Sequence, residues 1–491
     1  MMKYLIRLLL LITLVTSCKE DNNKFQPTFI ISSETTHKIP ENQDFTFGYL
    51  EVLEDKSKPE GTKLKLPVYI FKSRNSNPSK DPIIYTVGGP GSSTMRSAQY
   101  MNSYMYLDDR DFILFEQRGT QYAQPHLDCP EWSEAVYKSN LPSFDSAGSD
   151  KLFENAAKQC KKRLEEKGIN LSTYNTNAIA ADIVDLKNAL NIDTYNLLSL
   201  SYSTKIAQVL IRDYPEGIRS VVMDSPLPLE VNYDEESITN LMNALDTLFS
   251  DCQTDIDCRK SYPNLKHRFL SYLKEKTENP LIVSVANPNT KKEETFYLTG
   301  ADLVAVFENA SVTNIPYEIN KLLNSDLSSL KYQLAQLFNN KGFGAGQGMR
   351  LSVWCAEEEP FNSESNIKYE VNKYKELKGL SSSVFSKSVC DIWGVKKAKD
   401  IENEPVKSTI PVLLINGDYD SETPPRWAKS MTNNLSNSQH FVFKGWRHGP
   451  TTNWSNQCAM ELANSFFNNP NKIAEVDCYK KIKTPKFKLA E

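Results

Sequence analysis

Four short apolar runs divide the first half of the chain, and each has the length of one buried strand. They span residues 82–87, 111–115, 195–200 and 218–223. Continuous apolar runs of this length are typical of strands covered on both faces. Before the third run, apolar residues recur at helical spacing from Ile179 to Leu190, and Asn177 is placed to cap that helix. This succession predicts a mostly parallel sheet with helices on both faces.

A different pattern precedes the four runs. Residues 47–52 and 63–70 alternate apolar and polar positions, and the turn-rich residues 58–61 separate them. Alternation of this kind predicts a half-buried antiparallel hairpin at the start of the sheet.

After the fourth run the strands stop for about 180 residues. The helical periods of this part span residues 241–249, 265–273 and 317–337. Buried strands return at 410–415 and 440–443. We therefore expect one α/β domain, formed by residues 45–228 and 408–491, with a mainly helical lid inserted at 229–407.

The turn after the third run carries a candidate nucleophile, Ser201. The strand at 195–200 leads directly into a helical period, so Ser201 lies on a sharp strand-to-helix turn. Such a turn exposes the serine hydroxyl, and the N–H of Tyr202 can face a developing oxyanion. The usual elbow has glycine two residues before and after the serine, whereas this chain has Ser199 and Ser203.

A serine needs an imidazole to take its proton and a carboxylate to orient that imidazole. His448 lies in a glycine-flanked loop after the last strand, where ligands bind in open α/β sheets. Asp418 and Asp420 both follow the strand at 410–415, and either could instead serve a turn. The order Ser201, Asp420, His448 is that of an α/β-hydrolase triad.

The amino terminus has the features of an export signal. Residues 1–17 contain Lys3, Arg7 and a short apolar run, and Cys18 follows Val-Thr-Ser as in a bacterial lipobox. An ordinary secretory signal with an incidental cysteine is the alternative. Residues 18–44 are expected to form a tether and leading segment. We expect an exported lipoprotein at a periplasmic or cell-surface membrane face, anchored through Cys18.

Nine cysteines support export into an oxidising compartment. Without Cys18 eight remain, enough for four disulfides: Cys129, Cys160, Cys252, Cys258, Cys355, Cys390, Cys458 and Cys478. Pairing of neighbours is our prediction among 105 possible connectivities. We reject a zinc site, because the chain has no Cys-x-x-Cys pair and its histidines lie far from the cysteine pairs. The formal net charge of -4 argues against a nucleic-acid partner.

Five motifs resemble those of one known family. They are Val-Gly-Gly-Pro-Gly-Ser at 87–92, Phe-Glu-Gln-Arg-Gly-Thr at 115–120, the stretch 195–203, Gly-Asp-Tyr-Asp-Ser-Glu-Thr-Pro-Pro at 417–425 and Gly-Trp-Arg-His-Gly at 445–449. In this order they are similar to the motifs of the secreted tripeptidyl aminopeptidase and proline iminopeptidase group of α/β-hydrolases. The cysteine pattern, including Cys355 in the lid, is similar too.

The resemblance implies the α/β-hydrolase fold and a role for each site residue. It implies Ser201 as nucleophile, Asp420 rather than Asp418 as orienting acid, and His448 as base. The N–H groups of Gly89 and Tyr202 are the implied oxyanion hole.

In this family an acid in or beside the lid holds the substrate's ammonium group. Glu357, after the lid cysteine, is our candidate, with Glu358 and Glu359 as weaker ones. Arg118 is expected to be a structural anchor that satisfies carbonyl groups near the strand ends.

These observations predict a serine aminopeptidase that releases short peptides or single residues, including proline, from free N-termini. No metal or organic cofactor is implied, and a monomer is expected. One alternative is an esterase on the same fold, because the triad does not distinguish amides from esters. Another is a catalytically silent surface binding protein, which the serines flanking the elbow would suit.

Overall fold

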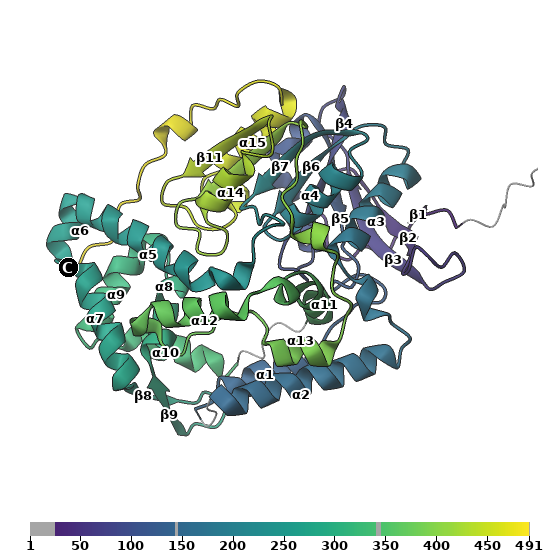
Figure 1. Ribbon diagram of the computed structural model, residues 1–491. Coiled ribbons are helices and arrows are strands. Elements are labelled where there is room, and N and C mark those ends of the chain that lie inside the picture. The colour runs from purple at the N-terminus through teal and green to yellow at the C-terminus, as the bar shows by residue number, and fades with distance from the viewer. Residues whose placement is uncertain (1–24, 143–145, 340–344, 491) are drawn as a thin grey trace, which may run out of the picture.

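A computed structural model describes residues 25–142, 146–339 and 345–490 (Figure 1). The predicted signal peptide at 1–17, the predicted lipidation site Cys18 and the tether up to residue 24 lie outside the described residues. Within the described parts of the chain, no helix has the length and apolar character needed to cross a membrane.

Nine strands form one sheet in the order β1-β2-β3-β5-β4-β6-β7-β10-β11. Their bounds are β1 (Thr28–Ile31), β2 (Phe45–Leu53), β3 (Lys63–Phe71), β4 (Ser79–Thr86), β5 (Arg110–Phe115), β6 (Tyr195–Leu200), β7 (Ile218–Asp224), β10 (Val412–Gly417) and β11 (Ser438–Phe443). All neighbours from β5 to β11 are parallel, and β1, β2 and β3 are antiparallel to their neighbours. The sheet is therefore mostly parallel, as predicted, and the carboxyl ends of β4, β6, β7 and β10 share one edge.

Strand β1 belongs to the segment expected to be tether and leading chain. It pairs with β2 over only four residues, and most of its side chains are exposed. A short exposed edge strand leaves no alternating apolar pattern, which is why the sequence did not indicate it.

Helices cover both faces of the sheet. The helices of this part are α1 (Pro130–Ser139), α2 (Ser146–Glu165), α3 (Thr176–Ala189), α4 (Ser203–Asp213), α14 (Pro425–Met431) and α15 (Cys458–Asn468). Apolar residues of α3, α4 and α14 share one buried cluster with one face of the sheet. Apolar residues of α15 share a second cluster with the opposite face.

The inserted segment has a core of its own. Its elements are α5 (Ser237–Thr254), α6 (Ile256–Ser261), α7 (Leu265–Glu278), β8 (Leu281–Ala286), β9 (Glu293–Leu298), α8 (Gly300–Asn309), α9 (Ile315–Leu323), α10 (Ser328–Leu337), α11 (Gln347–Glu357), α12 (Glu364–Lys373) and α13 (Lys387–Trp393). Residues from α5 through α10 form a separate buried cluster. Helices α11 and α13 instead pack into the cluster of the sheet domain, next to α2 (Figure 1). The segment is therefore fixed to the sheet domain at its carboxyl end.

One local prediction was wrong, and two features of the lid were not predicted. Asn175, not Asn177, caps α3, because the Asn175 side chain accepts a hydrogen bond from the N–H of Ala178. The helical period at 317–337 is two helices, α9 and α10, and between them Ser325 has a φ of 63°. The lid also contains the antiparallel hairpin β8–β9, whose alternation of buried and exposed residues was overlooked.

Four disulfides join the neighbouring cysteines. They are Cys129–Cys160, Cys252–Cys258, Cys355–Cys390 and Cys458–Cys478. Two of them lie within the sheet domain and two within the lid, so none of the four links the lid to the sheet domain.

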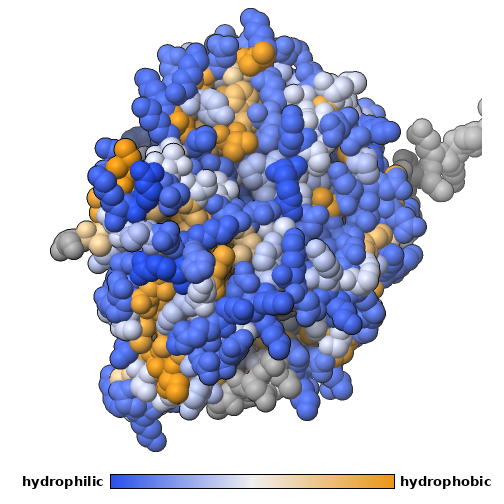
Figure 2. All heavy atoms as spheres, turned by 60° about the vertical axis from the view of Figure 1, so that its left-hand side comes forward, coloured by the Kyte–Doolittle hydropathy of each residue, from blue (hydrophilic) through white to orange (hydrophobic). Residues whose placement is uncertain are grey.

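Apolar side chains are scattered over the face seen in Figure 2. They form a few separate groups among mostly hydrophilic residues. Isolated exposed apolar residues are normal on protein surfaces.

Candidate active site

Ser201 lies on the turn between β6 and α4 in a conformation that is unusual for serine. Its φ is 60°, in the left-handed region, and its N–H donates to the carbonyl oxygen of Asp224 at 2.9 Å. A non-glycine residue held there is found mainly where the surrounding structure imposes it, often at functional sites. Ser201 therefore has the backbone geometry of a nucleophile elbow.

The serines beside the elbow are held by strand β4. The hydroxyl of Ser203 lies 2.9 Å from the carbonyl oxygens of both Thr86 and Leu200, and the Ser199 hydroxyl lies 3.3 Å from that of Thr86. The backbone of Gly88, after β4, lies close to the elbow: a Cβ on this residue would lie 2.6 Å from the Cβ of Ser201. The tight turn thus forms although the usual flanking glycines are absent.

His448 and Asp420 meet at the carboxyl edge of the sheet. Asp420 is buried, and its Oδ2 lies 2.9 Å from Nδ1 of His448. The hydroxyl of Thr423 lies 2.9 Å from the same Oδ2 and 3.1 Å from the same Nδ1. The N–H groups of Glu422 and Thr423 both donate to Oδ1 of Asp420 at 2.9 Å. Hydrogen bonds from Glu422 and Thr423 therefore hold the Asp420 carboxylate in addition to its contact with the imidazole.

Asp418 has a different partner. Its Oδ1 accepts a hydrogen bond from the N–H of Gly445 at 2.6 Å, at the start of the loop that carries His448. Burial raises the pKa of Asp418 to about 6. The geometry thus separates the two candidate acids: Asp420 contacts the histidine, and Asp418 holds its loop.

The pair of Asp420 and His448 favours its charged form. Burial opposes ionisation of both groups, but His448 and the hydrogen bonds from Thr423 lower the pKa of Asp420 below its usual value. Burial likewise opposes protonation of His448, but the Asp420 carboxylate, followed by Glu422 and Asp224, raises the pKa of the imidazole. A carboxylate that stabilises an imidazolium is what a serine nucleophile's base requires.

Asp224 connects the elbow with the histidine loop, and the sequence analysis missed it. Its carbonyl oxygen accepts from Ser201, and its carboxylate accepts from the N–H of Thr451 at 2.7 Å and from the Thr451 hydroxyl. The adjoining Ser225 hydroxyl accepts from the N–H of Gly449 at 2.9 Å. Asp224 ends β7, the neighbour of β6, and this place at the shared edge was the available signal.

The motif at 115–120 supports the loop that contains Gly89. Glu116 accepts hydrogen bonds from Ser93 and from the N–H of Thr94, and Gln117 donates to the carbonyl oxygen of Val87 at 2.6 Å. Gly89 has a φ of 116°, which favours glycine. Its N–H and that of Tyr202, at the start of α4, remain the proposed oxyanion donors.

Arg118 is a structural anchor, as expected. It makes two hydrogen bonds of 2.7 Å to the carboxylate of Asp182, and it donates to the carbonyl oxygens of Leu53, Glu54 and Thr173. Its side chain is fully buried, so the guanidinium has its acceptors within the protein.

Two of the three candidate lid glutamates have partners within the protein. Glu357 is buried and accepts hydrogen bonds from the N–H and hydroxyl of Thr176, the first residue of α3. Glu358 is buried and pairs with Lys205 of α4. Glu359 is partly exposed in a one-turn helix that follows α11. Glu357 therefore joins the lid to the sheet domain, and both of its carboxylate oxygens are bound by Thr176.

The metal-ligand groups of the described residues do not form a metal site. The one cluster of potential ligands there is Cys129, Glu131 and Cys160, and its two cysteines are joined in a disulfide. A disulfide sulfur is not the thiolate that zinc requires.

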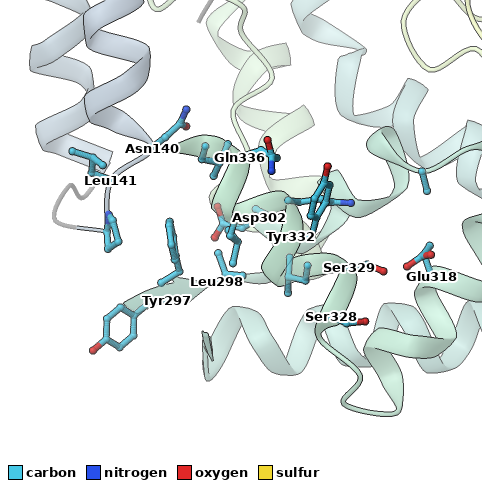
Figure 3. Close-up of a pocket in the computed structure, with 18 of the residues that line it drawn as sticks. Asn140, Leu141, Tyr297, Leu298, Asp302, Glu318, Ser328, Ser329, Tyr332 and Gln336 are labelled. Atoms are coloured by element: carbon cyan, nitrogen blue, oxygen red, sulfur yellow. The ribbon is translucent and has the colours of Figure 1, made fainter. Parts of the chain in front are cut away.

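A cavity of about 1220 Å³ lies between the lid and the end of α1, and none of the site residues lines it. Figure 3 shows Tyr297 and Leu298 of β9, Tyr332 of α10, and Asn140 and Leu141 after α1 among the residues of its wall. The candidate catalytic groups lie instead at the carboxyl edge of the sheet.

Comparisons with known proteins agree with this arrangement. The family model described as "TAP-like protein" matches residues 379–478, which include both Asp420 and His448. The tripeptidyl aminopeptidase of Streptomyces coelicolor is 23% identical over 413 residues, covering 77% of this chain and 72% of that protein. These likenesses support a TAP-like α/β-hydrolase.

Two further likenesses are weaker. The serine protease Hip1 of Mycobacterium tuberculosis is 20% identical to this chain over 430 residues, covering 82% of this chain and 81% of that protein. The proline iminopeptidase of Mycobacterium smegmatis is 13% identical, with a TM-score of 0.39 over 83% of this chain and 96% of that one. That score is too low to bear on the fold, which the strand order establishes by itself.

Proposed function

We propose that this TAP-like hydrolase is a serine aminopeptidase that cleaves peptide bonds near free N-termini. The contact between Asp420 and His448, beside a serine held at a φ of 60°, carries the proposal. The relatives named as a tripeptidyl aminopeptidase and a serine protease support a peptide as the substrate.

The reaction follows from the roles of the groups. The Ser201 hydroxyl attacks the scissile carbonyl and gives its proton to Nε2 of His448, while Asp420 stabilises the imidazolium. The N–H groups of Gly89 and Tyr202 stabilise the oxyanion. The leaving amine takes the proton from His448, and water activated by the same imidazole then releases the acyl group from Ser201.

The test compares the soluble chain, lacking residues 1–18, with its Ser201→Ala variant. We expect turnover of aminoacyl or tripeptidyl anilides with a free amine, loss of that turnover on acetylation, and a decrease of several orders of magnitude in the variant. Turnover of short acyl esters alone would instead indicate an esterase. Equal rates for the two proteins would remove Ser201 from the reaction.

We also propose that the protein is exported and anchored through a lipid on Cys18. Four disulfides support an oxidising compartment. The full chain is expected in the membrane fraction and its Cys18→Ala variant in the soluble fraction. Equal partitioning of the two would contradict the anchor.

A further inference from the structure

The side chain of Tyr202 is held from the lid. Tyr202 follows the proposed nucleophile Ser201, directly precedes α4 and is buried. Its hydroxyl lies 2.8 Å from the hydroxyl of Thr176, the first residue of α3. The Thr176 hydroxyl contacts Oε2 of Glu357, and the Thr176 N–H donates to Oε1 at 2.7 Å. A line of hydrogen bonds therefore joins the lid helix α11 to the residue after the nucleophile.

The hydrogen bonds in this line have one direction when Glu357 is ionised. Thr176 has a single hydroxyl proton, which it donates to the carboxylate. The Thr176 oxygen is then left as an acceptor, so the phenol of Tyr202 donates to it. All three side chains are buried. Breaking one link leaves a polar group without water to replace its partner, so the line strongly favours one position of the Tyr202 ring.

The same end of the lid helix makes a second contact with α4. Glu358, the next residue of the lid, pairs with Lys205. Lys205 lies three residues after Tyr202, on the same face of the helix, and its N–H donates to the carbonyl oxygen of Tyr202 at 2.9 Å. The carboxyl end of α11 therefore holds the first turn of α4 at two points, once directly and once through Thr176.

This first turn carries one of the two proposed oxyanion donors. The N–H of Tyr202 lies at the amino end of α4, where backbone N–H groups have no acceptor within the helix. A Cβ on Gly88 would lie 2.9 Å from the Tyr202 nitrogen, so this N–H adjoins the loop of the second donor, Gly89. An oxyanion donor is effective only at about 2.7–3.1 Å from the developing charge, and a displacement of about 1 Å can cost about 10²-fold in rate.

We propose that Thr176 and Glu357 are positioning residues that hold Tyr202 and thereby fix its N–H in the oxyanion hole. This inference rests on the proposed function, in which Ser201 attacks and the Tyr202 N–H stabilises the oxyanion. Thr176 and Glu357 act through the Tyr202 side chain and bind no substrate. The lid then contributes to the rate of the chemical step itself and not only to substrate binding.

The first test compares two buried tyrosines. Tyr202→Phe removes the phenol hydroxyl but keeps the ring and the N–H. Tyr195→Phe is the matched control, because Tyr195 is buried in β6 and its hydroxyl has no hydrogen-bond partner among the described residues. We expect Tyr202→Phe to lower kcat on a free-amine anilide about 10-fold with little change in KM, since the loss arises in the transition state. Tyr195→Phe should keep wild-type kinetics.

Variants of the other two residues test the same line of hydrogen bonds. Thr176→Val and Glu357→Ala should each lower kcat, whereas Thr176→Ser, which keeps the hydroxyl, should retain most of it. The double variant Tyr202→Phe/Thr176→Val should lose no more than either single variant, because both break one interaction. An aminoacyl trifluoromethyl ketone, whose tetrahedral adduct places an oxyanion in the hole, should bind the slow variants about 10-fold more weakly. Urea denaturation checks that each variant is folded.

The rate at which a fluorophosphonate labels Ser201 is measured on the same proteins, because this reaction needs no free amine. Labelling should slow in Tyr202→Phe and Thr176→Val and not in Tyr195→Phe. Wild-type kcat and labelling in Tyr202→Phe, a loss confined to KM, or additive losses in the double variant would overturn the positioning role and leave the aminopeptidase function in place. A wild type that is labelled but cleaves no anilide would contradict the aminopeptidase function, and the labelling rates would still decide the positioning role.

Discussion

Asp418 and Asp420 lie two residues apart on one loop, and their partners separate their roles. Asp420 contacts Nδ1 of His448, whereas Asp418 accepts from the backbone of Gly445. The sequence left both open as turn residues or triad acids, because the two follow the same strand. The choice of Asp420 came from resemblance, and only the folded loop shows which carboxylate reaches the imidazole.

These two aspartates give a matched pair of variants. Asp420→Asn should lower kcat by about 10³- to 10⁴-fold, because an amide does not stabilise the imidazolium and favours the wrong tautomer. Asp418→Asn keeps an acceptor for Gly445 and should retain most of the activity. Steady-state kinetics at pH 7 to 8, with circular dichroism to check folding, distinguish them. Equal losses in the two variants would contradict these roles.

Glu357 shows the limit of the sequence at the scale of single residues. Glu357 was chosen because it follows the lid cysteine, but its carboxylate holds the first turn of α3. The contact of Glu422 with Nε2 of His448 likewise depends on the conformation of the loop.

At the scale of elements, the carboxyl end of α11 is tied to the start of α3 and to α4. Glu357 contacts Thr176, and Glu358 pairs with Lys205. Burial raises the pKa of Glu357 from 4.5 to about 7, although the hydrogen bonds from Thr176 lower it. A carboxyl group whose pKa is raised on folding stabilises the protein below its unfolded pKa, and this contribution is lost as the pH rises through the folded pKa.

The pH dependence of unfolding tests this tie. Between pH 5 and pH 8 the free energy of unfolding should fall by up to about 3 kcal/mol because of Glu357. Glu357→Gln can keep the hydrogen bonds to Thr176 and should remove this part of the decrease, while Glu404→Gln should not. Urea denaturation at both pH values measures it. The same pH slope in Glu357→Gln and the wild type would contradict the assignment.

The disulfide Cys355–Cys390 joins α11 to α13, and it closes a longer loop than Cys252–Cys258. The sequence separations are 35 and 6 residues. In the chain-entropy account, the longer loop gives about 1.5 kcal/mol more stabilisation. The double variant Cys355→Ala/Cys390→Ala should therefore lose more stability in urea than Cys252→Ala/Cys258→Ala. The reverse order would show that loop entropy does not decide their contributions.

The elements themselves were largely predictable from the sequence. Continuous apolar runs located β4, β5, β6, β7 and β10, because strands buried on both faces need apolar residues at every position. Strand β1 and the hairpin β8–β9 were missed, since exposed or half-buried short strands leave weak patterns. Asn175 and Asn177 are both acceptable caps, and only the backbone conformation decides between them.

At the scale of the whole molecule, the triad loop is linked to the lid. Tyr419, next to Asp420, packs into the apolar cluster of the lid, and its hydroxyl donates to Asp251 of α5 at 2.6 Å. Phe487, near the end of the chain, joins the same cluster. The lid therefore packs directly against the loop that carries Asp420. A sequence pattern cannot give such contacts, because they join segments that are far apart in the chain.

The central claim is that Ser201 is a nucleophile activated by His448. The most direct measurement is covalent labelling with a fluorophosphonate, followed by intact mass and peptide mapping of the wild type, Ser201→Ala and His448→Ala. We expect one adduct on Ser201 in the wild type, none at that position in Ser201→Ala and labelling slowed by several orders of magnitude in His448→Ala. Absence of labelling in the folded wild type, or an adduct on another residue, would contradict the account.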